Sequence, residues 1–127
     1  MRIKRRSKSL FRRQAHGFHG YPIATIIFYG PDDTRASKAA VSIIAEEGGE
    51  AIELRRWFSD DTDVRHDPGI GHEIAEFIRI HGARSTVVAD RILGCPHEEG
   101  IDYPTGTKCP RCPFWGFRDR FTGEVIQ

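Results

Sequence analysis

All three cysteines of this chain lie in one short segment near its C-terminal end. Cys95 and His97 form a Cys-x-His pair, and Cys109 and Cys112 form a Cys-x-x-Cys pair after an eleven-residue connector. A Cys-x-x-Cys turn directs two thiolates toward one metal, and sulfur with imidazole suits tetrahedral Zn²⁺ better than a hard cation. An odd number of clustered cysteines also argues against a disulfide framework. The sequence therefore predicts one bound zinc ion.

The sequence leaves alternatives open at this site. The three thiols could stay free of metal, or the Cys-x-x-Cys pair could serve redox chemistry. If His97 points away from the thiols, another side chain could supply the fourth ligand: His72, His81 or Asp102. With four protein ligands in place the site would be structural, because a catalytic zinc usually keeps one open position.

The segment has two resemblances to known proteins. His97-x-Glu99 before Cys109-x-x-Cys112 superficially resembles the zinc nucleobase deaminases, but Cys95 already offers a fourth ligand and Lys108 replaces their proline. The run GCPHEEGIDYP at 94–104, continuing into CPRCPFW at 109–115, resembles a group of small uncharacterised bacterial proteins. The run IATIIFYGP at 23–31 resembles the start of the same group. This second resemblance covers roughly residues 21–120 and implies a metal site but no established activity.

The first half of the chain reads as a series of strands. Residues 23–29 are apolar and rich in β-branched side chains, and they stop at Gly30-Pro31, which is typical of a buried strand. Residues 39–46 and 51–58 read as two more strands, joined by a glycine-containing turn that suits a hairpin. On the third strand, Ile52 and Leu54 share one face.

A helix is predicted next. Asp67 is a suitable N-cap, Pro68 suits the first helical position, and Gly82 suits the C-terminal end. Apolar and aromatic side chains recur on one helix face: Ile70, Ile74, Phe77, Ile78 and His81. A fourth strand at 85–89 ends at Asp90. The order β-β-β-α-β predicts an α+β fold in which one helix packs on a small, mainly antiparallel sheet, followed by a C-terminal zinc knuckle.

The same element order resembles the first part of the ribonuclease H-like fold, whose carboxylates hold two Mg²⁺ ions for phosphodiester cleavage. Asp90, with Glu73 or Glu76 on the helix, could supply two of these carboxylates. The first strand has no acid, and Asp32 and Asp33 lie beyond its end. The simpler interpretation is that Asp90 opens a turn while the two glutamates face solvent.

Charge divides the chain into a basic tail and an acidic body. Residues 1–13 carry seven basic side chains and no acid, which leaves 12 basic and 18 acidic residues in 14–127, a formal charge of −6. An acidic body repels phosphate backbones, so nucleic acid would have to bind the tail or a local basic patch. We therefore expect residues 1–20 to form a basic, flexible tail and residues 21–127 to form a single domain that includes a zinc-binding segment at 94–121.

Aromatic and basic residues interleave near the C-terminus, an arrangement that can bind single strands by stacking and phosphate contacts. The alternative is that these rings cover the zinc knuckle. The predicted nucleic-acid contacts are Arg5, Arg6, Arg12, Arg13, Arg111, Trp115 and Arg118.

The functional class follows from these features. The sequence has no membrane-length apolar run and no signal-peptide pattern, so we expect a cytoplasmic protein with no membrane partner. We expect a non-enzymatic zinc-binding adaptor or regulatory module whose first partner class is RNA or single-stranded DNA and whose second is protein. The alternative is a metal-dependent nuclease or hydrolase on a ribonuclease H-like sheet.

Overall fold

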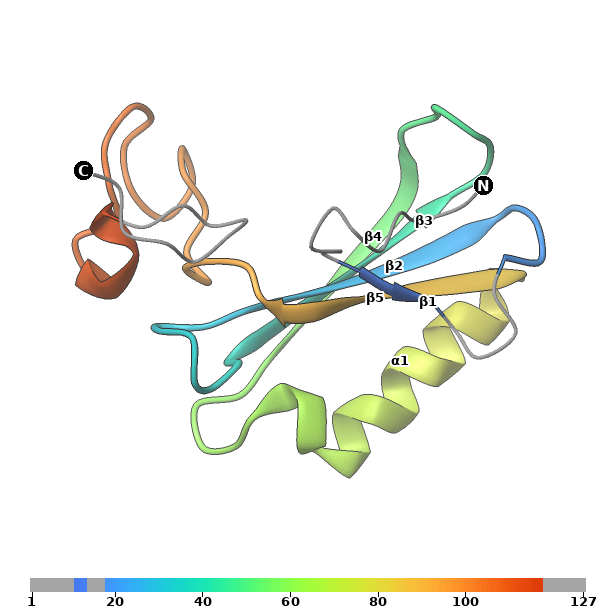
Figure 1. The fold of residues 1–127 in the computed structure, drawn as a ribbon, viewed down its shortest axis with the longest axis horizontal. Helices are drawn as coiled ribbons and strands as arrows, with labels where there is room; N and C mark the ends of the chain where they lie inside the picture. The colour runs from blue at the N-terminus through green and yellow to red at the C-terminus, as the bar shows by residue number, and fades with distance from the viewer. Residues whose placement is uncertain (1–10, 14–17, 118–127) are drawn as a thin grey trace.

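The computed structural model describes residues 11–13 and 18–117 (Figure 1). Its elements are β1 (Phe11–Arg13), β2 (Ile23–Tyr29), β3 (Lys38–Ile44), β4 (Ala51–Phe58), the 3-10 helix η2 (Val64–His66), α1 (Pro68–Ile80), β5 (Ser85–Ile92) and the 3-10 helix η3 (Pro113–Phe117). From β2 onward, this is the predicted order β-β-β-α-β. The α+β class is confirmed.

The strands form one sheet in the order β1-β5-β2-β3-β4. The pairs β2–β3, β3–β4 and β1–β5 are antiparallel, whereas β2–β5 is parallel. The parallel pair arises because the chain crosses from β4 through α1 to β5, and a parallel neighbour requires such a crossover. The sheet is therefore mixed, and α1 covers one of its faces (Figure 1).

The hydrophobic core lies between this face and α1. Alternate side chains of β2 and β3 point toward the helix and are joined by Trp57 of β4 and by residues of α1. The main contributors are Ala24, Ile26, Phe28, Ala39, Val41, Ile43, Trp57, Ile74 and Phe77. Trp57 and Phe77 meet edge to face, with ring centroids 5.8 Å apart.

The helix α1 begins and ends as predicted. The Asp67 side chain accepts a hydrogen bond from Ile70 N at 3.1 Å, and Pro68 occupies the first helical position. Gly82 follows the helix with a φ of 66°, a conformation that glycine adopts without a side-chain clash. No helix in the described part of the chain is long and apolar enough to span a bilayer.

The strands differ from the sequence prediction in three places. β3 spans 38–44 instead of 39–46, and β5 continues to Ile92 instead of ending at 89. β1 lies inside the segment that we predicted as a tail and pairs with β5. Backbone pairing accounts for this difference, because three residues can join a sheet edge without an apolar pattern. Residues 1–10 and 14–17 of the predicted tail lie outside the described residues.

The sheet face opposite α1 carries alternate residues of β2, β3 and β4. Residues that pair across the strands on this open face include Tyr29, Lys38 and Phe58 at one end and Thr25, Ser42 and Leu54 at the other. The chain leaves β5 on this side of the sheet and forms loops that include η3 (Figure 1). We call residues 94–117 the metal segment.

Candidate metal centre

Backbone hydrogen bonds fix the start of the metal segment to the end of β2. Leu93 N donates to Phe28 O at 2.8 Å, and Gly30 N donates to Gly94 O at 2.8 Å. Cys95 follows directly and is buried. The first candidate ligand is therefore held by the sheet itself, whereas Cys109 and Cys112 come from the returning part of the loop.

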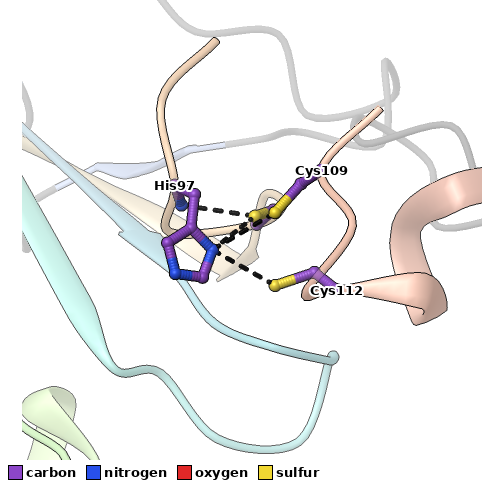
Figure 2. A group of neighbouring side chains, drawn as sticks. His97, Cys109 and Cys112 are labelled. Atoms are coloured by element: carbon purple, nitrogen blue, oxygen red, sulfur yellow. Dashed lines mark hydrogen bonds between the residues drawn. The ribbon is translucent and has the colours of Figure 1, made fainter. Parts of the chain in front are cut away.

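The four predicted ligands lie together. The Sγ atoms of Cys95, Cys109 and Cys112 lie 3.2, 3.3 and 3.5 Å from His97 Nδ1, and the four ligand atoms are all within 4.8 Å of one another. Figure 2 shows Cys109 and Cys112 directed toward the His97 ring. Around a tetrahedral zinc with bonds of about 2.0–2.3 Å, ligand atoms lie about 3.3–3.8 Å apart. This cluster could therefore bind a metal ion, as a zinc site does.

The alternative fourth ligands are engaged elsewhere. Asp102 Oδ2 accepts a hydrogen bond from Glu98 N at 2.7 Å, and the ring of His81 packs on Phe77 with centroids 4.6 Å apart. His72 is exposed on α1. His97 therefore completes the set, because its imidazole points toward the thiols and not away from them.

Burial disfavours the thiolate form of two of these cysteines. Burial raises the pKa of Cys95 and the pKa of Cys112 above the ordinary thiol value. Burial acts in the same direction on Cys109, but hydrogen bonds from the Arg111 backbone and from the neighbouring thiols outweigh it, so the pKa of Cys109 is lowered. Three thiolates this close together would repel one another, and a bound cation would compensate their negative charge.

Glu98 attaches the metal segment to the open face of the sheet. Its Oε2 accepts a hydrogen bond from Lys38 Nζ at 2.7 Å and another from Arg56 Nε at 2.5 Å, while Oε1 accepts one from Arg56 Nη2 at 3.1 Å. Lys38 Nζ also donates to Pro96 O at 2.9 Å. The side chain of Lys38 is only 4% exposed. Because both cations donate to the carboxylate, the pKa of Glu98 is lowered.

The connector folds back through its own hydrogen bonds. Glu99 Oε2 accepts from Gly106 N at 2.6 Å, and Gly100 N donates to Tyr103 O at 2.7 Å. Gly100 has a φ of 84°, which favours glycine. Glu99 thus supports the loop. In the deaminase pattern this glutamate relays protons beside a metal with an open position, whereas here four protein atoms surround the centre.

The ring of Trp115, near the end of the metal segment, packs against the hydrophobic core. Its Nε1 donates to Gly30 O at 2.8 Å, the side chain packs partly buried against the core, and Phe114 meets it edge to face at 5.0 Å. This placement favours the interpretation that the ring completes a small core. Nucleic-acid binding by Trp115 and by the exposed Arg111 stays a prediction.

The remaining predicted nucleic-acid contacts lie at the chain ends. The backbone of β1 contains Arg12 and Arg13, but their side chains are not among the described groups. Arg5, Arg6 and Arg118 lie outside the described residues altogether. The tail prediction therefore rests on sequence alone.

The carboxylates considered for a two-metal nuclease belong to no cluster of three or more candidate ligands in the described residues. Each has an arginine neighbour: Glu73 with Arg55, Glu76 with Arg79, and Asp90 with Arg91. Glu73 also accepts a hydrogen bond from Trp57 Nε1 at 2.9 Å. Over residues 18–117, the Cys/His cluster is the only group of three or more candidate ligand side chains close enough to share a metal.

Sequence reasoning missed the ion pairs that position the site. Lys38 looks like a residue at the polar end of an apolar strand, and Glu98 looks like one of several acids in a loop. Their pairing spans 60 positions in the chain. The one local signal is that Glu98 is adjacent to the ligand His97, which keeps its side chain near the metal centre.

Comparison with protein-family models, with curated proteins and with solved structures finds no significant match to this chain.

Proposed function

We propose that this chain is a binding module built around a structural zinc ion. Four protein ligand atoms that converge within 4.8 Å carry the proposal. A site with four protein ligands has no position for a substrate or a reactive water, which is typical of structural zinc. Three sulfurs and one imidazole favour Zn²⁺ over Mg²⁺ or Ca²⁺, because the hard cations prefer oxygen.

The residues around the centre fit this role. Cys95 and Cys112 are buried, so bound zinc would be shielded from solvent, and uptake of the ion would release thiol protons. The two half-sites come from opposite ends of the connector. A bound ion would therefore close the connector loop and hold it on the open face of the sheet. Lys38 and Arg56 already donate hydrogen bonds to Glu98 of this loop there.

The binding surface that we assign to the module lies where the metal segment meets this face. A pocket of about 370 Å³ is lined there by β-strand residues and by the metal segment, among them Tyr29, Ser42, Leu54, Arg56 and Tyr103. Its charges are mixed, because Glu98 and Glu99 lie beside Lys38 and Arg56. Such a pocket suits a partner that presents both polar and apolar groups.

Metal analysis of the purified full-length chain tests the zinc proposal. We expect about one zinc per chain by elemental analysis, and loss of that zinc in Cys112→Ala. His72→Ala is the matched control, because His72 is an exposed histidine of α1 and should leave the content unchanged. A folded, zinc-free chain with three freely titrating thiols would contradict the proposal.

RNA or single-stranded DNA is the partner class that we propose first. The support is the seven basic residues in 1–13 and the exposed Arg111. Removal of residues 1–10 deletes five of these basic residues and leaves β1 intact. The shortened chain should show a smaller dependence of binding on salt, because fewer counterions are released.

The measurement is binding of short RNA and DNA strands by both chains across a salt series. Arg111→Gln should weaken binding by both chains. If the full-length protein does not bind at low salt, the nucleic-acid proposal is wrong and a protein partner replaces it.

A further inference from the structure

The outer edge of β4 is an unpaired strand edge in the described structure. β4 is the last strand of the sheet, with β3 on one side and no described strand on the other (Figure 1). Seven of its eight residues are exposed, Trp57 being the exception. Its large apolar side chains Ile52, Leu54 and Phe58 are 60%, 45% and 63% exposed. An exposed edge with apolar side chains is a template for pairing with another chain.

The charges of β4 are arranged in a self-complementary way. Glu53 and Arg55 flank Leu54 and lie on the face that packs against α1, since they are opposite Ile43 and Val41 of β3. Leu54 lies on the open face. Proteins often block a sheet edge with charge, but one acid and one base placed symmetrically about a central residue attract a second copy instead of repelling it.

We propose that β4 pairs antiparallel with β4 of a second copy of this chain. The two-fold axis then runs perpendicular to the sheet, midway between Leu54 and Leu54 of the partner subunit. Leu54 then faces Leu54 of the partner subunit, and Glu53 faces Arg55 of the partner subunit on both sides of the axis. The two sheets become one, with both α1 helices on the same face. An interface of this kind is isologous, as in most homodimers.

The charges select this register over its neighbour. Opposite residues of an antiparallel pair lie on the same face of the sheet. The residue at the axis must therefore face its own copy, because neighbouring residues of one strand point to opposite faces. Axes at Leu54 or Arg55 pair seven of the eight residues of β4, counting Ile52, where the register of β4 against β3 shifts. An axis through Arg55 would place two guanidinium groups against each other and leave Glu53 opposite Trp57. The axis through Leu54 forms two ion pairs and one apolar pair.

Charge reversal with reciprocal mixing tests the register. Glu53→Lys places like charges opposite each other twice in a homodimer, and so does Arg55→Glu. In a mixture of these two variants, the introduced lysine faces the introduced glutamate, while Arg55 of one chain faces Glu53 of the other. We expect each variant alone to dimerise at least about tenfold more weakly than the unaltered chain. The mixture should recover the dimer as a heterodimer.

The measurement is sedimentation equilibrium of the full-length, zinc-loaded chains over a concentration series. Glu47→Lys is the matched control, because it makes the same charge change in the β3–β4 turn outside β4 and should leave the dimer intact. Arg55 also contacts Glu73 and Trp57, so Leu54→Lys provides a second disruption that keeps those contacts. Zinc content of each variant shows that the metal centre is intact.

Three results would overturn the proposal. The first is an unaltered chain that stays monomeric at all concentrations. The second is a dimer that Glu53→Lys and Leu54→Lys leave unchanged, because the interface would then lie elsewhere. The third is a mixture of the two charge variants that stays as dissociated as its components. None of these results bears on zinc binding, so the proposed function is tested separately.

Discussion

Replacement of Glu98 by glutamine should destabilise the chain by removing the charge that holds the metal segment on the sheet. The Glu98 carboxylate lies 2.7 Å from Lys38 Nζ and 2.5 Å from Arg56 Nε. Glutamine keeps the size of the side chain and one acceptor oxygen, but it carries no negative charge. The ammonium of Lys38 would therefore stay buried without its counter-charge.

The size of this destabilisation depends on which other groups compensate the positive charge of Lys38. Its side chain is 4% exposed, and among the described residues it also contacts three neutral groups, the carbonyl of Pro96 and the rings of Tyr29 and Phe58. Loss of one partner of a buried ion pair costs about 3–5 kcal/mol. Glu98 is 29% exposed, and glutamine can still accept a hydrogen bond, so the cost is reduced. We expect the free energy of unfolding to fall by about 2–3 kcal/mol.

Denaturant unfolding at buffered free zinc measures this change. Glu47→Gln is the matched control, because Glu47 is an exposed acid in the β3–β4 turn, and it should alter stability by less than about 0.5 kcal/mol. Lys38→Met combined with Glu98→Gln removes both charges of the pair, including the buried ammonium, and should be more stable than Glu98→Gln alone. A Glu98→Gln chain as stable as the control would refute the argument that this carboxylate compensates Lys38.

The remaining predictions concern other parts of the fold. Chelation should expose the metal segment to hydrogen exchange before β2, which belongs to the sheet core, and simultaneous loss of protection would contradict local coupling. Gly30→Ala would place a methyl group 2.0 Å from Arg35 O and should cost about 1–3 kcal/mol by thermal unfolding, whereas Gly71→Ala in α1 meets no atom and should be neutral or stabilising. Hydrogen bonds from Arg65 hold the pKa of Asp63 well below its ordinary value, so the stability it contributes is present near neutral pH and is lost as acid protonates it. Asp63→Asn should therefore reduce the acid dependence of unfolding.

Local sequence signals predicted a large part of this structure. The strands 23–29 and 51–58 have the predicted bounds, and α1 begins at Asp67-Pro68 because capping and proline chemistry act on adjacent residues. The clustering of Cys95, His97, Cys109 and Cys112 was predicted for the same reason, since each half of the cluster is a motif of three or four residues. Only the choice of the fourth ligand needed the structure, because it depends on how the loop folds back.

Features that depend on distant residues were not predictable. The alternation of Ile52 and Leu54 predicted that they share a face, but it gave no indication that α1 covers the opposite face of the sheet in the described structure. The pairing of Lys38 with Glu98 depends on where the metal segment meets the sheet, and β1 depends on a free edge of β5. In each case the interacting residue is distant in the sequence, so a local periodic pattern carries no information about the contact.

We expect zinc binding by the Cys/His cluster and the attachment of the metal segment to depend on each other. Cys95 is held at the end of β5, whereas Cys109 and Cys112 reach it only if the connector folds back, and Glu98 stabilises that folded arrangement. A contact formed only in the zinc-bound arrangement contributes its free energy to zinc affinity, by linkage. If the whole effect of Glu98→Gln, about 2–3 kcal/mol, acts there, the zinc dissociation constant rises by about 30- to 150-fold. Competition with a chromophoric chelator measures this constant. An unchanged constant in a destabilised chain would show that the ion pair forms with or without the metal.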